Sequence, residues 1–505
     1  MRAHGSSPGV QHQGCGALAN LATNNENFKA IARAGGIEAV VAGMVAQRSI
    51  EQVQESGCWA LAHLASNDEN AFAITIAGGI DAVVMGMRAH GSISGVQARG
   101  CWALWTLASV HTDTDPQTEV ARAGGIEAVL AGMGGHRSIA NVQEFGCGAL
   151  GNLAFFNDED RAAVVRLGGI KAVVAAMRAH KSVAGLQVNG HRALRNLAGN
   201  GENQTAIARA GGIEAVVAGM EAHGSIAAVQ QQGCWALVKL ALHDENKTAI
   251  ARAGGIEAVL AGMREHRTIA VQQQGCLALR NLAVNDANKS AIARAGGIEV
   301  VVAVMEAHGS SMVVQEACCG ALGNLASNND ENQTAIARAG GIEAVVAGMG
   351  AHKSSAGVQQ KGCWALGNLA VKEENQTAIA RAGGIEAVLT GMEARRSHAG
   401  VQQTGCRALS KLASNTDAIK TAIARAGGVE AVRAGMEAHA STAGVQKEGR
   451  SALKILESQS DENQAAIEEA GGIEASLLTR LGVAVPLVLF AFGAAAASTW
   501  SLLGE

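Results

Sequence analysis

A twelve-residue phrase, RAGGIEAVVAGM, recurs along this chain with small variations and constrains its fold more than any other feature. Its Gly-Gly pair returns every 42 to 46 residues, and the eleven pairs begin at Gly35, Gly78, Gly124, Gly168, Gly211, Gly254, Gly296, Gly340, Gly383, Gly427 and Gly471. Self-similarity at this period is typical of helical solenoids, in which each repeat buries its apolar face only against its neighbours. We therefore expect one elongated array rather than several globular domains.

Each repeat contains three segments with helical patterning, as residues 331–370 illustrate. ENQTAIARAGG begins with polar residues that can cap a helix and ends in Gly340 and Gly341, where glycine can take the left-handed C-terminal cap conformation. GIEAVVAGMGAH and VQQKGCWALGNLA then each carry an apolar stripe at helical spacing. Aromatic residues make up only 3% of the chain and there are only three prolines, which favours tightly packed helices over strands.

Three helices per repeat of about 40 residues, with glycine between the first two, resemble the armadillo repeat. The segments ENQTAIARAGGIEAVVAGM and VQQKGCWALGNLA are close to that family's pattern at both motifs. The resemblance covers roughly residues 5 to 475. It implies an all-α fold, a right-handed armadillo-type α-α superhelix of about eleven three-helix repeats.

The two ends of the chain depart from the repeat. We expect residues 1–475 to form the array, with its first repeat truncated, because MRAHGSSPGVQHQGC aligns with MRAHGSISGVQARGC from Met87 onward. The C-terminal segment 476–505 includes residues 481–504, which carry no charge and are long enough to span a bilayer. This segment is a candidate membrane anchor; a helix that caps the last repeat and a stretch read from a misplaced exon are the alternatives. A cytoplasmic location is expected, with the nucleus as a second possibility.

Cysteine and histidine each recur at one position of the repeat. Nine of the ten cysteines share a position: Cys15, Cys58, Cys101, Cys147, Cys234, Cys276, Cys319, Cys363 and Cys406. One small, soft residue per repeat predicts a packing position in a reducing compartment rather than a metal site or a disulfide. Histidines recur at the end of the second segment, too far apart to share a metal, and we expect them to serve the helix ends. No metal or cofactor is predicted.

The sequence contains none of the common catalytic motifs. There is no GxxxxGKS phosphate loop, no HExxH, no GxSxG and no kinase motif set. The formal charge of −4 on 505 residues does not indicate a nonspecific nucleic-acid surface. The prediction is a non-enzymatic scaffold or adaptor whose partner is a protein, with membrane association through residues 481–504 if the anchor is real.

The resemblance also predicts where a partner would bind. In armadillo proteins the third helices line a concave groove for extended segments, and the importin alpha proteins hold the peptide there through a Trp and an Asn four residues later. Here the Trp position carries Trp59, Trp102, Trp235 and Trp364, and the Asn position carries Asn20, Asn152, Asn196, Asn281, Asn324 and Asn368. Only Trp364 and Asn368 occur in the same repeat. Packing between repeats for the tryptophans, and service to the backbone of neighbouring helices for the asparagines, remain alternatives.

The charge of these segments suggests which partner would fit. Between the Cys and Asn positions there is no Asp or Glu. Positive charge is introduced after about residue 190 by Arg192, Arg195, Lys239, Arg280, Arg407, Lys411, Arg450 and Lys454. A mildly basic groove fits an acidic or phosphorylated extended segment, with arginines giving paired hydrogen bonds. A nuclear-import cargo receptor of the importin alpha kind is the alternative function. The predicted peptide-binding residues are Asn20, Trp59, Trp102, Asn152, Arg192, Asn196, Trp235, Lys239, Arg280, Asn281, Asn324, Trp364, Asn368, Arg407 and Lys411.

Overall fold

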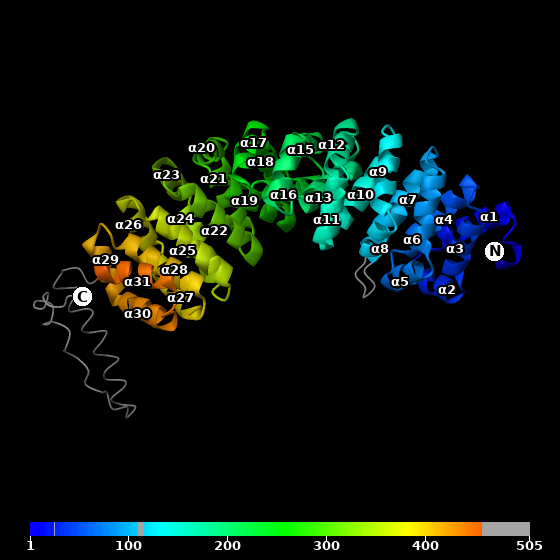
Figure 1. The fold of residues 1–505 in the computed structure, drawn as a ribbon. Helices are drawn as coiled ribbons and strands as arrows, with labels where there is room; N and C mark the ends of the chain where they lie inside the picture. Colours follow the sequence, from blue (N-terminus) through cyan, green and yellow to red (C-terminus); the bar gives the residue numbers. More distant parts are fainter. Residues whose placement is uncertain (25, 110–115, 457–505) are drawn as a thin grey trace, which may run out of the picture. The chain divides into compact units, whose positions relative to one another are not determined.

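A computed structural model describes residues 1–24, 26–109 and 116–456, and these residues form α-helices without any strand (Figure 1). The chain divides into two compact units, Met1–Leu369 and Ala370–Glu505, and each is described here by itself. The predicted array boundary at residue 475 and the apolar segment 481–504 lie outside the described residues. The three-helix repeat is confirmed in both units.

The helices fall into three classes that alternate along the chain after a short 3-10 helix, η1 (Arg2–His4). The first helices are α2 (Asn27–Arg33), α5 (Asp68–Ile76), α8 (Pro116–Arg122), α11 (Asp158–Arg166), α14 (Gly201–Arg209), α17 (Asp244–Arg252), α20 (Asp286–Arg294), α23 (Asp330–Arg338), α26 (Glu373–Arg381) and α29 (Asp417–Arg425). The second helices are α3 (Gly36–Ala46), α6 (Gly79–Ala89), α9 (Gly125–Gly135), α12 (Gly169–Ala179), α15 (Gly212–Ala222), α18 (Gly255–Glu265), α21 (Gly297–Ala307), α24 (Gly341–Ala351), α27 (Gly384–Ala394) and α30 (Gly428–Ala438). The third helices are α1 (Pro8–Leu21), α4 (Glu51–Leu64), α7 (Ser94–Leu107), α10 (Ala140–Phe156), α13 (Ala184–Leu197), α16 (Ala227–Leu240), α19 (Ile269–Leu282), α22 (Met312–Ala326), α25 (Ala356–Leu369), α28 (Ala399–Leu412) and α31 (Ala443–Leu456).

The Gly-Gly pair makes the turn between the first and second helices, as predicted. Gly340 has φ of 79°, in the left-handed region that side chains disfavour. A Cβ atom on Gly341 would lie 2.5 Å from the Ile336 side chain and 2.9 Å from its carbonyl oxygen. The first glycine is therefore required by its backbone conformation and the second by close packing of the two helices.

The core lies between the second and third helices of each repeat and between successive third helices. In the first unit each third helix from α1 to α25 packs against the next, and in the second unit α28 packs against α31. The recurrent methionine of the second helix covers the glycine that precedes the cysteine position. At Gly146 an added Cβ would lie 2.6 Å from Cγ of Met133. Both residues therefore belong to the core.

A glutamine on each third helix from α4 to α31, buried in all but α31, ties it to the second helix of its own repeat. Gln230 donates from Nε2 to the carbonyls of Met220 (2.8 Å) and His223 (3.0 Å) at the end of α15. The His223 carbonyl also accepts from the backbone N–H of Ile226 at 3.0 Å. Its Oε1 lies against Gly262 of the next repeat, where a Cβ would come within 2.7 Å. The same pair of bonds recurs at Gln54, Gln97, Gln143, Gln187, Gln272, Gln315, Gln359, Gln402 and Gln446.

The recurrent histidines serve the helix ends, as expected. His266 follows the last residue of α18, and its Nε2 lies 2.7 Å from the carbonyl oxygen of Gly224 in the preceding repeat. Equivalent contacts are made by His90, His136, His180, His223, His352 and His439. Each histidine therefore joins two successive repeats.

Within the described ranges, no single helix has both the length and the apolar composition needed to cross a bilayer. The pair α5 and α6 meets these two criteria jointly but is bent by 70° at its junction.

Candidate protein-binding face

The third-helix face is formed by the side chains at the Trp and Asn positions and those beside them on α1 to α25. At these positions the predicted residues Trp59, Trp102, Arg192, Trp235, Arg280, Asn324 and Trp364 are half-buried, Asn152, Asn196, Asn281 and Asn368 are buried, and Asn20 and Lys239 are exposed. Arg407 and Lys411 lie on α28 and belong to the second unit. The first unit therefore brings thirteen of the predicted residues onto one row of packed helices.

The asparagines join one third helix to the one before it. Asn152 donates from Nδ2 to the carbonyl of Trp105 at 3.0 Å, and Asn368 donates to that of Gly323 at 2.8 Å. Asn196, Asn281 and Asn324 make the equivalent bond. Four of these amides satisfy carbonyls that the C-terminal turn of a helix leaves open, whereas Gly151, the acceptor for Asn196, lies five residues before the end of α10. Among the residues that the structure describes, the side chain of Asn20 has no such partner.

Aromatic side chains form a row across α4, α7 and α10. His63 links Trp59 and Trp102, with ring centroids 6.0 and 4.8 Å away, and Phe145 stacks on Trp102 at 5.6 Å. Arg99 lies over both tryptophans, 5.1 and 5.6 Å from their ring centroids. The tryptophans therefore pack between repeats, as the alternative interpretation held, and still keep part of their surface in solvent.

Glycines at the Trp position make room for side chains of neighbouring repeats. A Cβ on Gly148 of α10 would lie 2.7 Å from the ring of Trp105, and one on Gly320 of α22 would lie 2.8 Å from Cδ of Arg280. On the same face, the ring of Trp364 lies against Gly323. Each of these glycines is therefore paired with a large side chain of a neighbouring repeat.

Two arginines of α13 hold positive charge without a carboxylate partner. Arg192 lies 5.3 Å from the Trp105 ring centroid, and Arg195 lies 3.9 Å from that of Trp235. Arg195 donates to the amide oxygens of Asn196 and Gln232, both at 2.9 Å. Burial, followed by the charge of Arg192, lowers the pKa of Arg195 to about 10. Neither guanidinium forms an ion pair within the described part of the chain.

The face also carries carboxylates that the sequence reasoning missed, because they lie before the cysteine position. Glu55, Glu144 and Glu316 lie against Gly95, Gly185 and Gly357, in the first turn of the next third helix. There they meet the positive end of a helix dipole. Glu316 also acts electrostatically on Arg280 and Lys361, so the positive charge at α19 to α25 is partly compensated. The uncompensated charge is concentrated at α13 and on Lys239 of α16.

The cysteines are packing residues, as predicted. All ten are buried, and burial raises the pKa of thiols such as Cys101 and Cys234 to about 12. Cys318 takes the place of the usual glycine, and its Sγ lies 3.2 Å from that of Cys276. No group of three or more potential metal ligands occurs in residues 1–24, 26–109 and 116–456.

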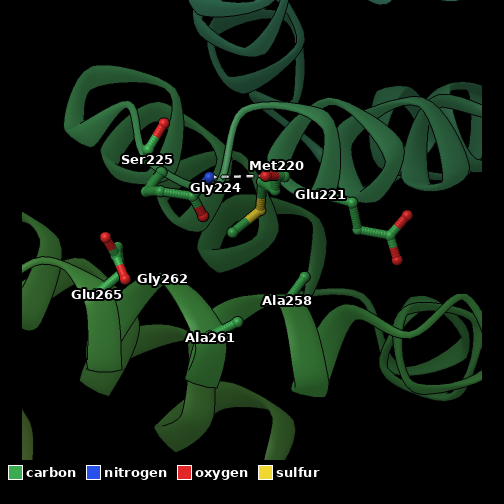
Figure 2. Close-up of a pocket in the computed structure, with 9 residues that line it drawn as sticks. Met220, Glu221, Gly224, Ser225, Ala258, Ala261, Gly262 and Glu265 are labelled. Carbon is green, nitrogen blue, oxygen red and sulfur yellow. Dashed lines mark hydrogen bonds between the residues drawn. The ribbon is translucent and has the colours of Figure 1, made fainter.

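Two hollows differ in their relation to this face. One, of about 510 Å³, lies on the face itself and is lined by α1, α4 and Arg99. The other, of about 390 Å³, lies between α15 and α18 and is shown in Figure 2, with Glu221 and Glu265 at its sides and small residues such as Ala261 on its floor. The dashed line marks the bond from Gln230 to Met220, which is made within one repeat. Because α15 and α18 belong to successive repeats, this second hollow is part of the contact between repeats.

Comparison with known proteins places the chain in a family. The model of the family described as protein zer-1 homolog-like, C-terminal domain, matches residues 175–419. A structure from a study of the phosphorylation switch that controls the interaction between cadherin and β-catenin has a TM-score of 0.68 at 16% identity, covering 92% of this chain and 95% of that one. A crystal structure of an engineered protein from the Northeast Structural Genomics Consortium is 30% identical, with a TM-score of 0.70 over 84% of this chain and 99% of that one. The chain belongs to the armadillo repeat family.

No curated protein matches the sequence of this armadillo chain. Its fold is the one predicted from the repeat, and the likeness to the structure from the β-catenin study, at 16% identity, concerns the fold alone. An armadillo-type solenoid is typical of scaffolds that bind other proteins. On the third-helix face, the two arginines of α13 are partly or fully buried positive charges that have no ion pair among the described residues.

Proposed function

We propose that this armadillo protein is a non-enzymatic scaffold that binds an extended acidic or phosphorylated protein segment along its third-helix face. The observation that carries the proposal is the pair Arg192 and Arg195. Arg192 is half-buried and Arg195 is buried. Each guanidinium group lies against an aromatic ring and donates to at least one amide oxygen. Neither has an ion pair among the described residues. A partly desolvated cation without a counterion gains most from an anionic ligand.

The charges on the neighbouring helix α16 also favour a negatively charged partner. Lys239 on α16 is exposed, and no glutamate of the kind seen on α4, α10 and α22 stands at the equivalent positions of α13 or α16. A basic cargo peptide of the importin alpha kind would meet like charge here. The structural neighbour from the cadherin and β-catenin study, where phosphorylation controls the interaction, supports an anion-sensitive protein contact by analogy only.

The test uses a pair of charge reversals on exposed side chains. Lys239→Glu changes the third-helix face, and Arg252→Glu makes the same charge change on the exposed end of α17, away from that face. The probes are a fluorescein-labelled 15-residue peptide of alternating Glu and Ser, its phosphoserine form and a copy with Lys for Glu. Fluorescence anisotropy at two salt concentrations measures Kd.

We expect the acidic peptides to bind and the lysine peptide to bind much more weakly. Lys239→Glu should raise Kd by roughly three- to tenfold, since a reversed surface charge loses one weak ion pair and adds a repulsion. Binding should also weaken as salt rises. Equal effects of Lys239→Glu and Arg252→Glu, or preference for the lysine peptide, would reject the acidic-partner proposal.

A further inference from the structure

The repeat that contains α21 and α22 departs from the others at a core position of its third helix. Ten of the eleven described third helices have glycine directly before the Cys position, whereas α22 has Cys318 there, followed by Cys319. In the preceding repeat this glycine is Gly275, where an added Cβ would lie 2.5 Å from Cγ of Met263. A side chain at this position therefore needs space elsewhere in the core.

The Cys318 side chain finds this space beside the preceding third helix. Its Sγ lies 3.2 Å from Sγ of Cys276 on α19, within hydrogen-bonding distance. Elsewhere in the first unit, a Cβ on Gly233 of α16 would lie 3.4 Å from the ring of His191, at the Cys position of α13. The Cys position of one third helix thus faces the glycine position of the next. Among the described third helices, only α19 and α22 carry a sulfur at both of these positions.

The core holds these two thiols together and shields them from solvent. Both side chains are fully buried, and α19 packs against α22. Burial, followed by the hydrogen bond with the Cys276 thiol, raises the pKa of the Cys318 thiol well above its usual value. Cys318 therefore stays protonated and weakly nucleophilic in the closed core, and its chemistry requires the two repeats to separate transiently.

We propose that Cys276 and Cys318 form an oxidation site, at which hydrogen peroxide joins the two repeats through a disulfide. A transiently exposed thiolate attacks one peroxide oxygen, the O–O bond breaks, and the sulfur becomes a sulfenic acid as hydroxide leaves. The second thiolate then attacks that sulfur, and the S–S bond forms as a second hydroxide leaves. The two hydroxides take up the two thiol protons. Two thiols and one hydrogen peroxide thus give one disulfide and two waters.

The geometry favours this pair of cysteines over the adjacent pair in the sequence. A disulfide holds its sulfurs about 2.0 Å apart, so small rotations of two side chains whose sulfurs are already 3.2 Å apart are sufficient. Cys319 follows Cys318 directly in α22, and successive residues of a helix do not face each other. Cys318 is therefore placed to bond with Cys276 rather than with Cys319.

The disulfide would lie in the core close to part of the third-helix face. Arg280 follows Cys276 by about one turn of α19, and a Cβ on Gly320 of α22 would be 2.8 Å from Cδ of Arg280. A covalent bond between the two helices restrains their separation, so oxidation should slow amide hydrogen exchange in both. The oxidation site is independent of which partner the third-helix face binds.

The experiment exposes the reduced full chain to hydrogen peroxide, in native buffer and in urea below the unfolding midpoint. Remaining thiols are then blocked with N-ethylmaleimide in denaturant, and disulfides are mapped by trypsin digestion and mass spectrometry. The diagnostic product joins peptides 268–280 and 295–338, and dithiothreitol separates them. Cys318→Gly restores the usual residue of the repeat, and Cys319→Ala is the matched control that removes the neighbouring sulfur. Circular dichroism monitors the folding of each variant.

The wild-type chain and Cys319→Ala should both give the linked peptides, and Cys318→Gly should give none. Amide exchange in α19 and α22 should become at least about tenfold slower when the wild-type chain is oxidised, and should not change in Cys318→Gly. Absence of the linked peptides in both buffers, or their persistence in Cys318→Gly, overturns the site. A bond between Cys318 and Cys319, or the same mixture of linkages that the fully unfolded chain gives, overturns the pairing.

Discussion

Replacement of Gln230 by alanine should destabilise the middle of the first unit far more than the same replacement of a solvent-exposed glutamine. Gln230 is buried, and its Nε2 supplies both hydrogen bonds to the carbonyls of Met220 and His223. Each bond contributes about 0.5–1.5 kcal/mol, and a buried carbonyl left unsatisfied costs about 1–3 kcal/mol. The expected loss is therefore about 2–4 kcal/mol for the repeat that contains α15 and α16.

The matched control is Gln231→Ala, the neighbouring half-buried glutamine of α16, which lacks these two bonds. Because stability in a solenoid is distributed over neighbouring repeats, the measurement is amide hydrogen exchange resolved by segment, supported by urea titration. Gln230→Ala should raise exchange rates in α15, α16 and the adjacent α18, and Gln231→Ala should change the free energy of opening by less than about 0.5 kcal/mol. Equal effects of the two substitutions would refute the claim that the buried glutamine amide joins the second and third helices.

Three further predictions concern other contacts of the first unit. His191 stands at the cysteine position of α13, and its burial lowers the pKa of the imidazole to about 4. Because the unfolded chain binds the proton more readily, the free energy of unfolding should be highest above about pH 6.5 and fall by roughly 3 kcal/mol as the pH drops toward 4. His191→Cys, which restores the usual residue, should reduce the dependence of the urea midpoint on pH across this range. An unchanged pH dependence would contradict the assignment of this effect to His191. Asn368→Ala should cost about 1–3 kcal/mol by leaving the Gly323 carbonyl unbonded, whereas Asn20→Ala should leave the thermal midpoint unchanged. Gly340→Ala should cost about 1–2 kcal/mol because of its positive φ, and a neutral result in thermal unfolding would show that the turn adjusts.

The sequence predicts the fold well because the repeat presents the same physical requirements in every copy. The Gly-Gly turn, the methionine and cysteine core positions and the histidine at the helix end each have a local cause that can be read from one repeat. The buried glutamine could have been predicted in the same way, since its partner glycine of the next repeat is replaced only at Ala176 and Val304 among the described second helices of the first unit. The periodicity of the sequence is therefore sufficient to predict most of the helices and their packing within a repeat.

The candidate site is less predictable because it depends on contacts between different repeats. Asn152 and Asn368 look alike in sequence to Asn20, yet the first two bind carbonyls of the preceding helix and Asn20 does not. Trp105 lies outside the expected Trp position and crosses Gly148 to reach Arg192. Such contacts follow from which residues face each other across a helix pair, and a single repeat does not contain that information.

The central claim is that an acidic segment binds along the third helices of the first unit, at α13 and α16. Photo-crosslinking tests this most directly, with the phosphoserine peptide carrying benzoylphenylalanine at successive positions and the linked residues identified by mass spectrometry. The account predicts cross-links to residues of α13, α16 and the adjacent α10 and α19, and a lower yield of these cross-links with Lys239→Glu at peptide concentrations below Kd. Cross-links concentrated on the first helices, such as α14 and α17, or on the second-helix hollow between α15 and α18, would contradict it.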